Sequence, residues 1–453
     1  MFFIIIAAFL PFIVYQTVKY RKLFKDIKIG LFDISLICFA IISVISSLLS
    51  EDIISSFIGN NGWYVGALTV CFFVLLYLYI SSFIKYSHML WLPVLLVLNA
   101  VMVIAIFNFA GIDVLSMHEG IADNPMFYTS TIGNINRFSC LVCIFLPLLF
   151  IFFLACDKIF SRIIYLSSFV LCMICGFLCS CDSFYLGLGF SFIFAIPYIF
   201  SSIKRLSDTL LLFVISAGLL VLCSCLPFFG RIRDNSAGIS SIILNIKFAL
   251  PVFAVLIFIY LPVLFLKGKI GIKFLRTAKY TVFTVMTALV LVFALKSFIG
   301  FNDASGSYRG LIYRISFEKF SDFPFIQKLF GLGPEKAYLI YDEVSTVFGM
   351  KCLVSHSEFI QALITTGIVG AASYLFIVVS FFRDFFKNKT FCSDSIAFCL
   401  PVTAYLSCAL VNSATTVNLV FVALIYAMKK PYNKKYKGAE YEFRAEKSKI
   451  SNQ

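Results

Sequence analysis

The chain has 453 residues, of which 61% are hydrophobic and only 13% are charged. A water-soluble domain of this size needs a more polar surface, so these proportions exclude a soluble protein. The net charge is +14, but the basic residues lie in short clusters between apolar stretches, and no soluble basic module that could bind nucleic acid is present. The sequence therefore predicts an all-α polytopic membrane protein surrounded by lipid.

Apolar stretches of about 17 to 25 residues recur along the chain, and each is long enough to cross a bilayer as a helix. The predicted spans are 1–17, 31–49, 64–84, 89–110, 137–155, 162–179, 183–202, 208–228, 240–266, 279–299, 357–382, 396–411 and 414–428. The last two are short and could form a hairpin that only partly crosses, so we expect 12 or 13 spans. The first stretch has no basic residue ahead of it and a basic cluster after it, which predicts an anchor helix rather than a cleaved signal peptide.

The distribution of Lys and Arg predicts the orientation. With the N-terminus outside, the cytoplasmic segments hold 26 of the 37 basic residues. The opposite loops 50–63 and 111–136 contain no Lys or Arg but several acidic residues. We therefore expect one membrane domain over 1–428, whose long outer loop is 300–356. A basic cytoplasmic tail over 429–453 should lie near anionic lipid headgroups.

Most of the fifteen cysteines lie inside the apolar stretches. Cys140 and Cys143 have CxxC spacing, as do Cys172 and Cys175, but both pairs fall within predicted spans. We interpret them as small hydrophobic residues rather than as metal or redox sites. Cys352 stands alone in the long loop.

Five arginines break the rule against positive charge outside: Arg137, Arg231, Arg233, Arg309 and Arg314. Positive residues kept where topology disfavours them are candidates for function, although interfacial anchoring and helix capping are alternatives.

The long outer loop contains a predicted helix over 309–322. Ile312, Ile315 and Phe320 fall on one face of this helix and Arg314 on another, so we expect it to lie on the membrane surface.

A tight turn and a histidine follow this helix. Gly331 and Gly333 permit the backbone angles of a Gly-x-Gly-Pro turn. His356 precedes the next span, beside two serines and Glu358. Its imidazole has a reference pKa near neutrality and could take a proton from an attacking hydroxyl, whereas a capping role is the plainer alternative.

The run GSYRGLIYRISFEKFSDFPFIQKLFGLGPEKA, followed by SHSEFIQALITTGIVGAASY, resembles the signature of the O-antigen ligase and O-antigen polymerase family. The segment STIGNINRFSC, with Asn134 and Asn136, is similar to the family's asparagine segment before a proline-containing span. A weaker match is GNNGWYVG at 59–66, where Trp63 replaces a frequent arginine.

The resemblance implies a multi-span glycosyltransferase of the type C class in the bacterial cytoplasmic membrane, with its active site at the outer face. Such enzymes move a glycan from a polyprenyl diphosphate carrier to a hydroxyl on a glycan, lipid or wall polymer, and they need no metal or other cofactor. Arg309 and Arg314 match the family's loop arginines, and Arg231 or Arg233 falls where another is often found. His356 matches the family histidine that orients or deprotonates the acceptor.

Two other functions stay open from the residues alone. A metal-dependent polyprenyl-phosphate sugar transferase would use an acidic pair in the first outer loop, where Glu51 and Asp52 stand. A polysaccharide transporter or lipid flippase would show repeats and mid-span charges. We detect no repeat, and the spans are nearly free of charge except for Lys247. The sequence does not separate a ligase from a polymerase.

Overall fold

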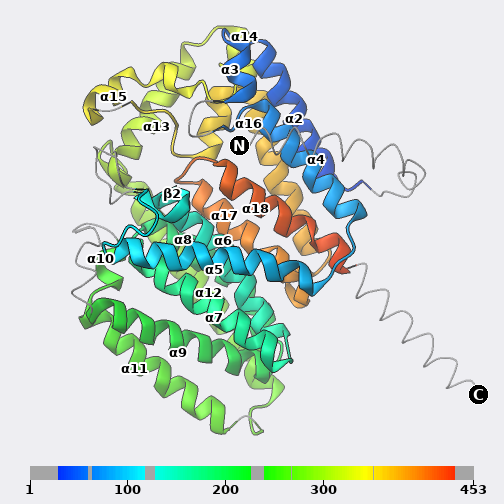
Figure 1. The fold of residues 1–453 in the computed structure, drawn as a ribbon, viewed down its shortest axis with the longest axis vertical. Helices are drawn as coiled ribbons and strands as arrows, with labels where there is room; N and C mark the ends of the chain where they lie inside the picture. The colour runs from blue at the N-terminus through cyan, green and yellow to red at the C-terminus, as the bar shows by residue number, and fades with distance from the viewer. Residues whose placement is uncertain are drawn as a thin grey trace, which may run out of the picture. The chain divides into compact units, whose positions relative to one another are not determined.

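The computed structural model describes residues 29–59, 64–117, 128–225, 239–266, 268–349 and 351–433 (Figure 1). Within these residues, nine helices are long and apolar enough to cross a membrane. Two shorter apolar helices cover Ala67–Phe83 and Asp394–Ala409. The chain is therefore an all-α, multi-pass membrane protein, because helices satisfy every backbone hydrogen bond where no water is present.

The elements follow one another with short connections. The helices of the first half are α2 (Leu31–Leu48), α3 (Ile53–Ile58), α4 (Ala67–Phe83), η2 (His88–Leu90), α5 (Trp91–Phe109), η4 (Ser130–Ile132), α6 (Ile135–Ala155), α7 (Ile159–Leu178), α8 (Asp182–Ile199) and α9 (Ile203–Cys225). Those of the second half are α10 (Ile239–Ile243), α11 (Ile246–Phe265), α12 (Ile272–Ile299), α13 (Ser305–Ser321), α14 (Phe325–Phe330), η6 (Ala337–Ile340), α15 (Asp342–Phe348), α16 (Glu358–Lys387), η7 (Thr390–Cys392), η8 (Asp394–Phe398), α17 (Leu400–Ala409) and α18 (Thr416–Ala427). Two short strands, β1 (Tyr128–Thr129) and β2 (Gly133–Asn134), pair in antiparallel fashion.

A helix occupies each predicted span from 31–49 onward, and the predicted span 1–17 lies outside the described residues. Two helices begin earlier than predicted. Helix α9 starts at Ile203 rather than 208, and α12 starts at Ile272 rather than 279. In both, the basic cluster predicted as a loop forms the first helical turns, because Lys and Arg are good helix formers whose long side chains reach the headgroups.

The chain divides into two compact units. Unit 1 takes the described residues of Met1–Tyr86, Asp303–Phe385 and Ser413–Gln453, and unit 2 takes those of Ser87–Asn302 and Phe386–Asn412. The long loop therefore belongs to the same unit as the first and last described helices.

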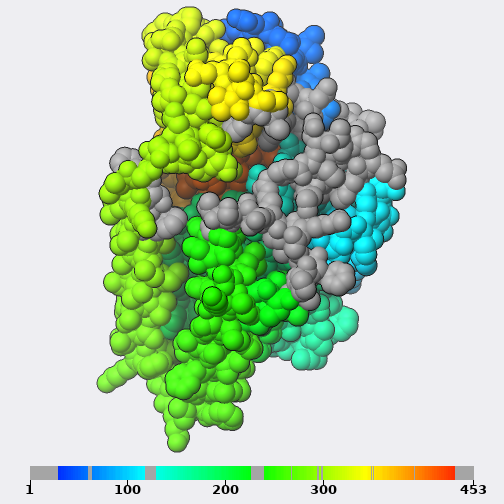
Figure 2. All heavy atoms as spheres, turned by 90° about the vertical axis from the view of Figure 1, so that its left-hand side faces the viewer, coloured from blue at the N-terminus to red at the C-terminus, as the bar shows by residue number. Residues whose placement is uncertain are grey.

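Unit 2 is built around α6, whose membrane-length window is 94% buried. Helices α7, α8 and α17 pack against it, and small residues allow close approach. The ring of Phe184 fills the space beside Gly176, and the thiols of Cys143 and Cys408 face Gly187. At the edge of this unit, α11 and α12 are only 6% buried, and Figure 2 shows their green and yellow-green surfaces exposed along the helices. Their apolar faces suit contact with lipid.

The CxxC cysteines are packed as small hydrophobic residues. Cys140, Cys143, Cys172 and Cys175 are all buried, and no disulfide joins any cysteine of the described segments. The interpretation from the sequence is confirmed.

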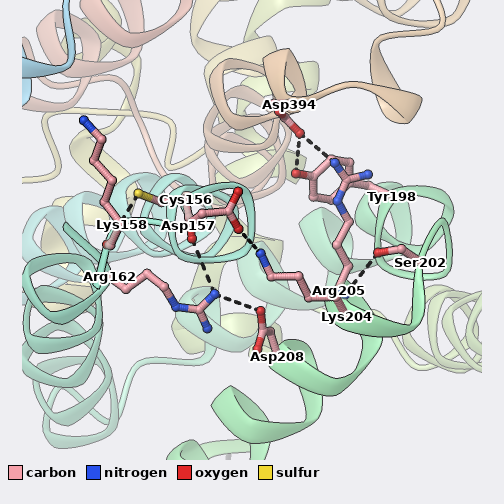
Figure 3. Close-up of polar contacts among 10 residues, drawn as sticks. All are labelled: Cys156, Asp157, Lys158, Arg162, Tyr198, Ser202, Lys204, Arg205, Asp208 and Asp394. Atoms are coloured by element: carbon pink, nitrogen blue, oxygen red, sulfur yellow. Dashed lines mark hydrogen bonds and ion pairs between the residues drawn. The ribbon is translucent and has the colours of Figure 1, made fainter. Parts of the chain in front are cut away.

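One end of unit 2 is tied by a network of ion pairs (Figure 3). It joins the α6–α7 and α8–α9 connections to η8, all of which the charge pattern assigns to one side. The pairs are Arg162–Asp208 at 3.0 Å, Arg205–Asp394 at 2.9 Å and Lys204–Asp157. The two arginines also stack on the rings of Phe153 and Tyr198. The basic residues here are matched by carboxylates, so this cluster is structural.

In unit 1, α2 and α4 lie beside α18, as Figure 1 shows. A buried carboxylate joins their ends. Asp33 is 2% exposed and accepts hydrogen bonds from the Lys430 ammonium at 2.6 and 2.9 Å and from the Tyr77 hydroxyl at 3.0 Å. At the other end of α2, Lys336 donates to Asp52 at 2.9 Å. The long loop and the C-terminal end of α18 therefore lie at opposite ends of α2.

Candidate functional site

The long loop folds as a small helical layer with its own core. We call the described residues between 303 and 366 the cap. Its core consists of Leu311, Ile312, Ile315, Phe323, Ala337, Tyr341, Val344, Cys352, Ile360 and Ile364. The predicted helix over 309–322 is present as part of α13, but its apolar face packs against protein rather than lying on the membrane surface. Ile312 is 1% and Ile315 0% exposed, because α15 and the start of α16 cover that face.

Helix α16 is bent, which corrects the predicted continuous span 357–382. Gly367 has φ 70° and ψ −169° inside the helix. The Tyr374 hydroxyl donates to Glu358 at 3.0 Å. Sixteen residues of straight helix would separate their backbones by about 24 Å. The two halves therefore fold toward each other, and the first half, with Ile360 and Ile364, belongs to the cap core.

The Gly-x-Gly-Pro turn fills this bend. The backbone N–H groups of Leu332 and Gly333 donate to the carbonyls of Ile364 and Thr365 at 3.0 and 2.9 Å. These carbonyls would otherwise lose their helical partners at the bend. The turn therefore completes α16.

Two glycines allow this close approach. Gly331 has φ 74°, and a Cβ there would lie 2.3 Å from the backbone of Thr365. Gly367 has φ 70°, and a Cβ there would lie 2.3 Å from the backbone of Leu329. Gly333 has φ 104°. The predicted tight turn at 331–334 is confirmed, and each segment needs glycine where it meets the other.

The turn also holds the region of the weaker resemblance, 59–66. Glu335 is 7% exposed, and its carboxylate accepts from the Val65 N–H. Lys336 is buried and donates to Asp52 and to the Ser55 hydroxyl, both at 2.9 Å. The Lys336 hydrogen bond is the main cause of a lowered pKa at Asp52. Three segments far apart in the sequence thus meet in unit 1.

Arg309 and His356 come together on this framework. The left-handed residues 306–308 precede Arg309, whose guanidinium closes the turn by donating to the Gly306 carbonyl at 2.7 Å. The half-buried His356 also has a left-handed backbone, with φ 50°. Burial, and then the charge of Arg309, lowers its pKa to about 4. The imidazole is therefore neutral at pH 7.

Arg314 has a different environment on the same helix. Its guanidinium donates to both oxygens of Asp303, at 3.0 to 3.2 Å, and to both oxygens of Glu318, at 3.0 and 3.1 Å. These hydrogen bonds raise the pKa of Arg314. An anion that bound Arg314 would have to displace a carboxylate.

The remaining candidates lie outside unit 1. Asn134 caps α6, because its side chain accepts from the N–H groups of Asn136 and Arg137 at 2.9 and 3.3 Å. Asn136 accepts from the Cys181 thiol at 3.1 Å. Arg231 and Arg233 fall outside the described residues.

Sequence reasoning missed the two tyrosines beside His356. The Tyr313 hydroxyl donates to the His356 carbonyl at 3.1 Å, and the buried Tyr341 hydroxyl donates to Ser355 at 2.7 Å. Tyr313 had a detectable signal, since it follows Arg309 by four residues and so shares its helical face. Tyr341 had none, because only folding of the cap brings it to this turn.

Strained backbone gathers near the predicted outer segments. The non-glycine residues with positive φ in the described segments are Tyr64, Ser116, Ser130, Ser180, Ser307, Tyr308, Glu335, His356 and Lys389. All except Lys389 lie in or next to segments that the charge pattern places outside. Such conformations persist only where the surroundings enforce them, and they are frequent at functional sites.

The fold defines the class of this chain, a multi-pass helical membrane protein whose longest loop forms a folded cap. Comparison with protein-family models, curated proteins and solved structures finds no match. In the part of the chain that the structure describes, no group of three His, Cys, Asp or Glu side chains has a metal-binding arrangement.

Proposed function

We propose that this protein transfers a glycan from a polyprenyl diphosphate carrier to an acceptor hydroxyl at the outer face of the bacterial cytoplasmic membrane. The observation that carries the proposal is the meeting of Arg309 and His356 on the cap, where a neutral base lies within electrostatic reach of an arginine. The O-antigen ligase and polymerase motifs add to it, since most of their residues fall in the same unit.

The two residues suit the two ends of the reaction. His356 accepts the proton of the acceptor hydroxyl as its oxygen bonds to the anomeric carbon of the sugar. The bond from that carbon to the phosphate oxygen breaks, and the diphosphate leaves with the electron pair. Arg309 stabilises the leaving charge through charge-assisted hydrogen bonds.

Donor binding would also strengthen the base. A diphosphate beside Arg309 offsets the positive charge that helps to lower the pKa of His356. The pKa of His356 should then rise toward its ordinary value, leaving only the effect of burial. The base would be most effective when the donor is in place.

His356→Ala and Arg309→Ala test the proposal, with the exposed Lys319→Ala on the same helix as the matched control. We expect His356→Ala to slow glycan transfer by about 100-fold or more, as the loss of a general base does. Arg309→Ala should weaken use of the donor, and Lys319→Ala should change neither. Transfer of labelled glycan from its lipid carrier is measured in membranes. Wild-type rates in both variants, at normal membrane levels, would refute the proposal.

One observation favours a transporter as the second candidate, because broken membrane helices are common in transporters. In α16, however, the carbonyls freed by the bend bond to the Gly-x-Gly-Pro turn rather than lining a path. Proteoliposomes separate the two functions. A transporter moves the intact lipid-linked glycan across the bilayer, whereas a transferase releases the polyprenyl diphosphate.

The metal-dependent transferase has weaker support, since Asp52 of the acidic pair is hydrogen-bonded to Lys336. Loss of transfer after treatment with a divalent-metal chelator would favour that function.

A further inference from the structure

The turn that carries His356 needs support from its surroundings. A left-handed backbone is unfavourable for any residue with a Cβ, and His356 has φ 50°. Without such support, the turn would relax to a commoner conformation and move the imidazole away from Arg309.

Tyr341 supports the turn from the core side. It is 0% exposed, and its hydroxyl lies 2.7 Å from both the Ser316 hydroxyl on α13 and the Ser355 hydroxyl. Ser316 and Ser355 are also 0% exposed. Removal of the phenol oxygen would leave these buried hydroxyls with fewer partners, which is costly inside a core.

Further bonds support the turn from other sides. The Tyr313 hydroxyl donates to the His356 carbonyl at 3.1 Å. The Ser355 N–H donates to the Gln361 side chain at 2.8 Å, and the Gln361 N–H donates to the Ser357 carbonyl at 2.8 Å. Each of the three residues of the turn is therefore bonded to α13, to Tyr341 or to α16.

We propose that Tyr341 and Tyr313 are positioning residues, which hold the Ser355–Ser357 turn in its left-handed form and so keep His356 beside Arg309. The catalytic consequence rests on the proposed glycan transfer, whereas the holding of the turn does not. The two tyrosines act through the backbone and side chains of the turn and need not touch the substrate.

The first test is structural and uses the full chain in detergent. Tyr341→Phe and Tyr313→Phe should raise hydrogen–deuterium exchange in peptides covering 353–358 and change the rate at which diethyl pyrocarbonate modifies His356. The matched control is Tyr280→Phe, at a position that is 59% exposed on α12. If exchange and modification stay at wild-type values in both variants, the proposal is overturned.

A background substitution shows whether the tyrosines oppose backbone strain. Glycine adopts the left-handed conformation freely, so a His356→Gly chain should hold the turn with less help. Tyr341→Phe should then raise exchange less in the His356→Gly background than in the wild type. An equal rise in both backgrounds would mean that Tyr341 only fills the core. Should Tyr341→Phe fail to fold, Tyr313→Phe, whose side chain is only half-buried, gives the same comparison.

The second test is kinetic. We expect each tyrosine variant to lower kcat for glycan transfer by about 10-fold or more, with the KM for the lipid-linked donor within about twofold, because misplacing a catalytic group affects the chemical step. Looser turns with an unchanged kcat would overturn the positioning role. If the wild-type chain transfers no glycan, the proposed function fails, and the exchange experiments still decide whether the tyrosines hold the turn.

Discussion

The acid–base behaviour of His356 follows from its position between the cap core and Arg309. Both burial and the nearby guanidinium disfavour the protonated imidazole, and its pKa falls to about 4. On the same helix, Arg314 is saturated by two carboxylates. Two arginines five residues apart thus have different chemistry, and Arg309 is the better candidate for binding a diphosphate.

Acid should destabilise the cap through His356. In the unfolded chain its pKa is near 6.5, so the unfolded state takes up a proton before the folded state does. Stability from this residue is complete above about pH 6.5 and is lost as the pH falls toward 4. We expect a loss on the order of 2 kcal/mol. Thermal unfolding of wild type and His356→Asn at pH 7 and 4.5 measures it, and an equal loss in both would contradict the assignment.

The interlocked glycines should tolerate no side chain. Gly367→Ala or Gly331→Ala would place a Cβ 2.3 Å from the opposing backbone at a positive φ. We expect each to cost about 2 to 5 kcal/mol from strain and overpacking. Gly189→Ala is the matched control, because nothing lies within 4 Å of its Cβ in α8. Detergent-solubilised yield and melting temperature report the effect, and similar values for all three variants would show that the bend can relax.

At the scale of elements, α16 and the Gly-x-Gly-Pro turn form one structural piece. The second half of α16 runs along α2, where Ser380 bonds to Ser35 at 2.9 Å, and the first half enters the cap. The bend therefore links the membrane helices directly to the turn that holds His356. Any change in the packing of α2 against α16 would be felt at the candidate site.

The buried pair of α2 and α18 should be asymmetric in its energetics. Lys430→Ala leaves the buried Asp33 carboxylate without its ammonium partner, whereas Asp33→Ala leaves a lysine that is 41% exposed and can reach water. We therefore expect Lys430→Ala to cost about 3 kcal/mol or more, and Asp33→Ala less. Melting temperatures of both, with exposed Lys387→Ala as control, measure the order. The reverse order would mean that Asp33 is not held as a buried charge.

At the scale of the whole molecule, contacts within each unit agree on sidedness. In unit 1 the cap meets one end of α2, and Lys430 meets the other. In unit 2 the paired connections of Figure 3 all come from segments assigned to the same side. The alternation of basic and acidic loops along the chain predicts that the cap faces outward.

Labelling of single cysteines tests this orientation. Val347→Cys lies on the exposed face of α15, where valine is 55% exposed, and should react with an impermeant maleimide in intact cells. Lys389→Cys, between α16 and α17, should react only after the membrane is opened. The wild-type chain measures labelling of the native cysteines. Labelling of Lys389→Cys alone in intact cells would invert the topology.

The sequence by itself determined the class, the spans from 31–49 onward and the two tight-turn glycines. These depend on local properties, since a long apolar stretch in a bilayer must be helical and a glycine permits a turn wherever it stands. It also brought out Arg309 and His356, because both are unusual residues for their place in the chain.

The tertiary structure decided what surrounds those residues. Gly367 is compatible with a straight or a bent helix, and only the N–H donors of 332–333, more than thirty residues away, make the bend favourable. Likewise, the apolar face of α13 fits lipid or protein equally well until Tyr341 and Ile364 cover it. The neutral His356 exists because these long-range contacts bury it beside Arg309, and no local pattern encodes such contacts.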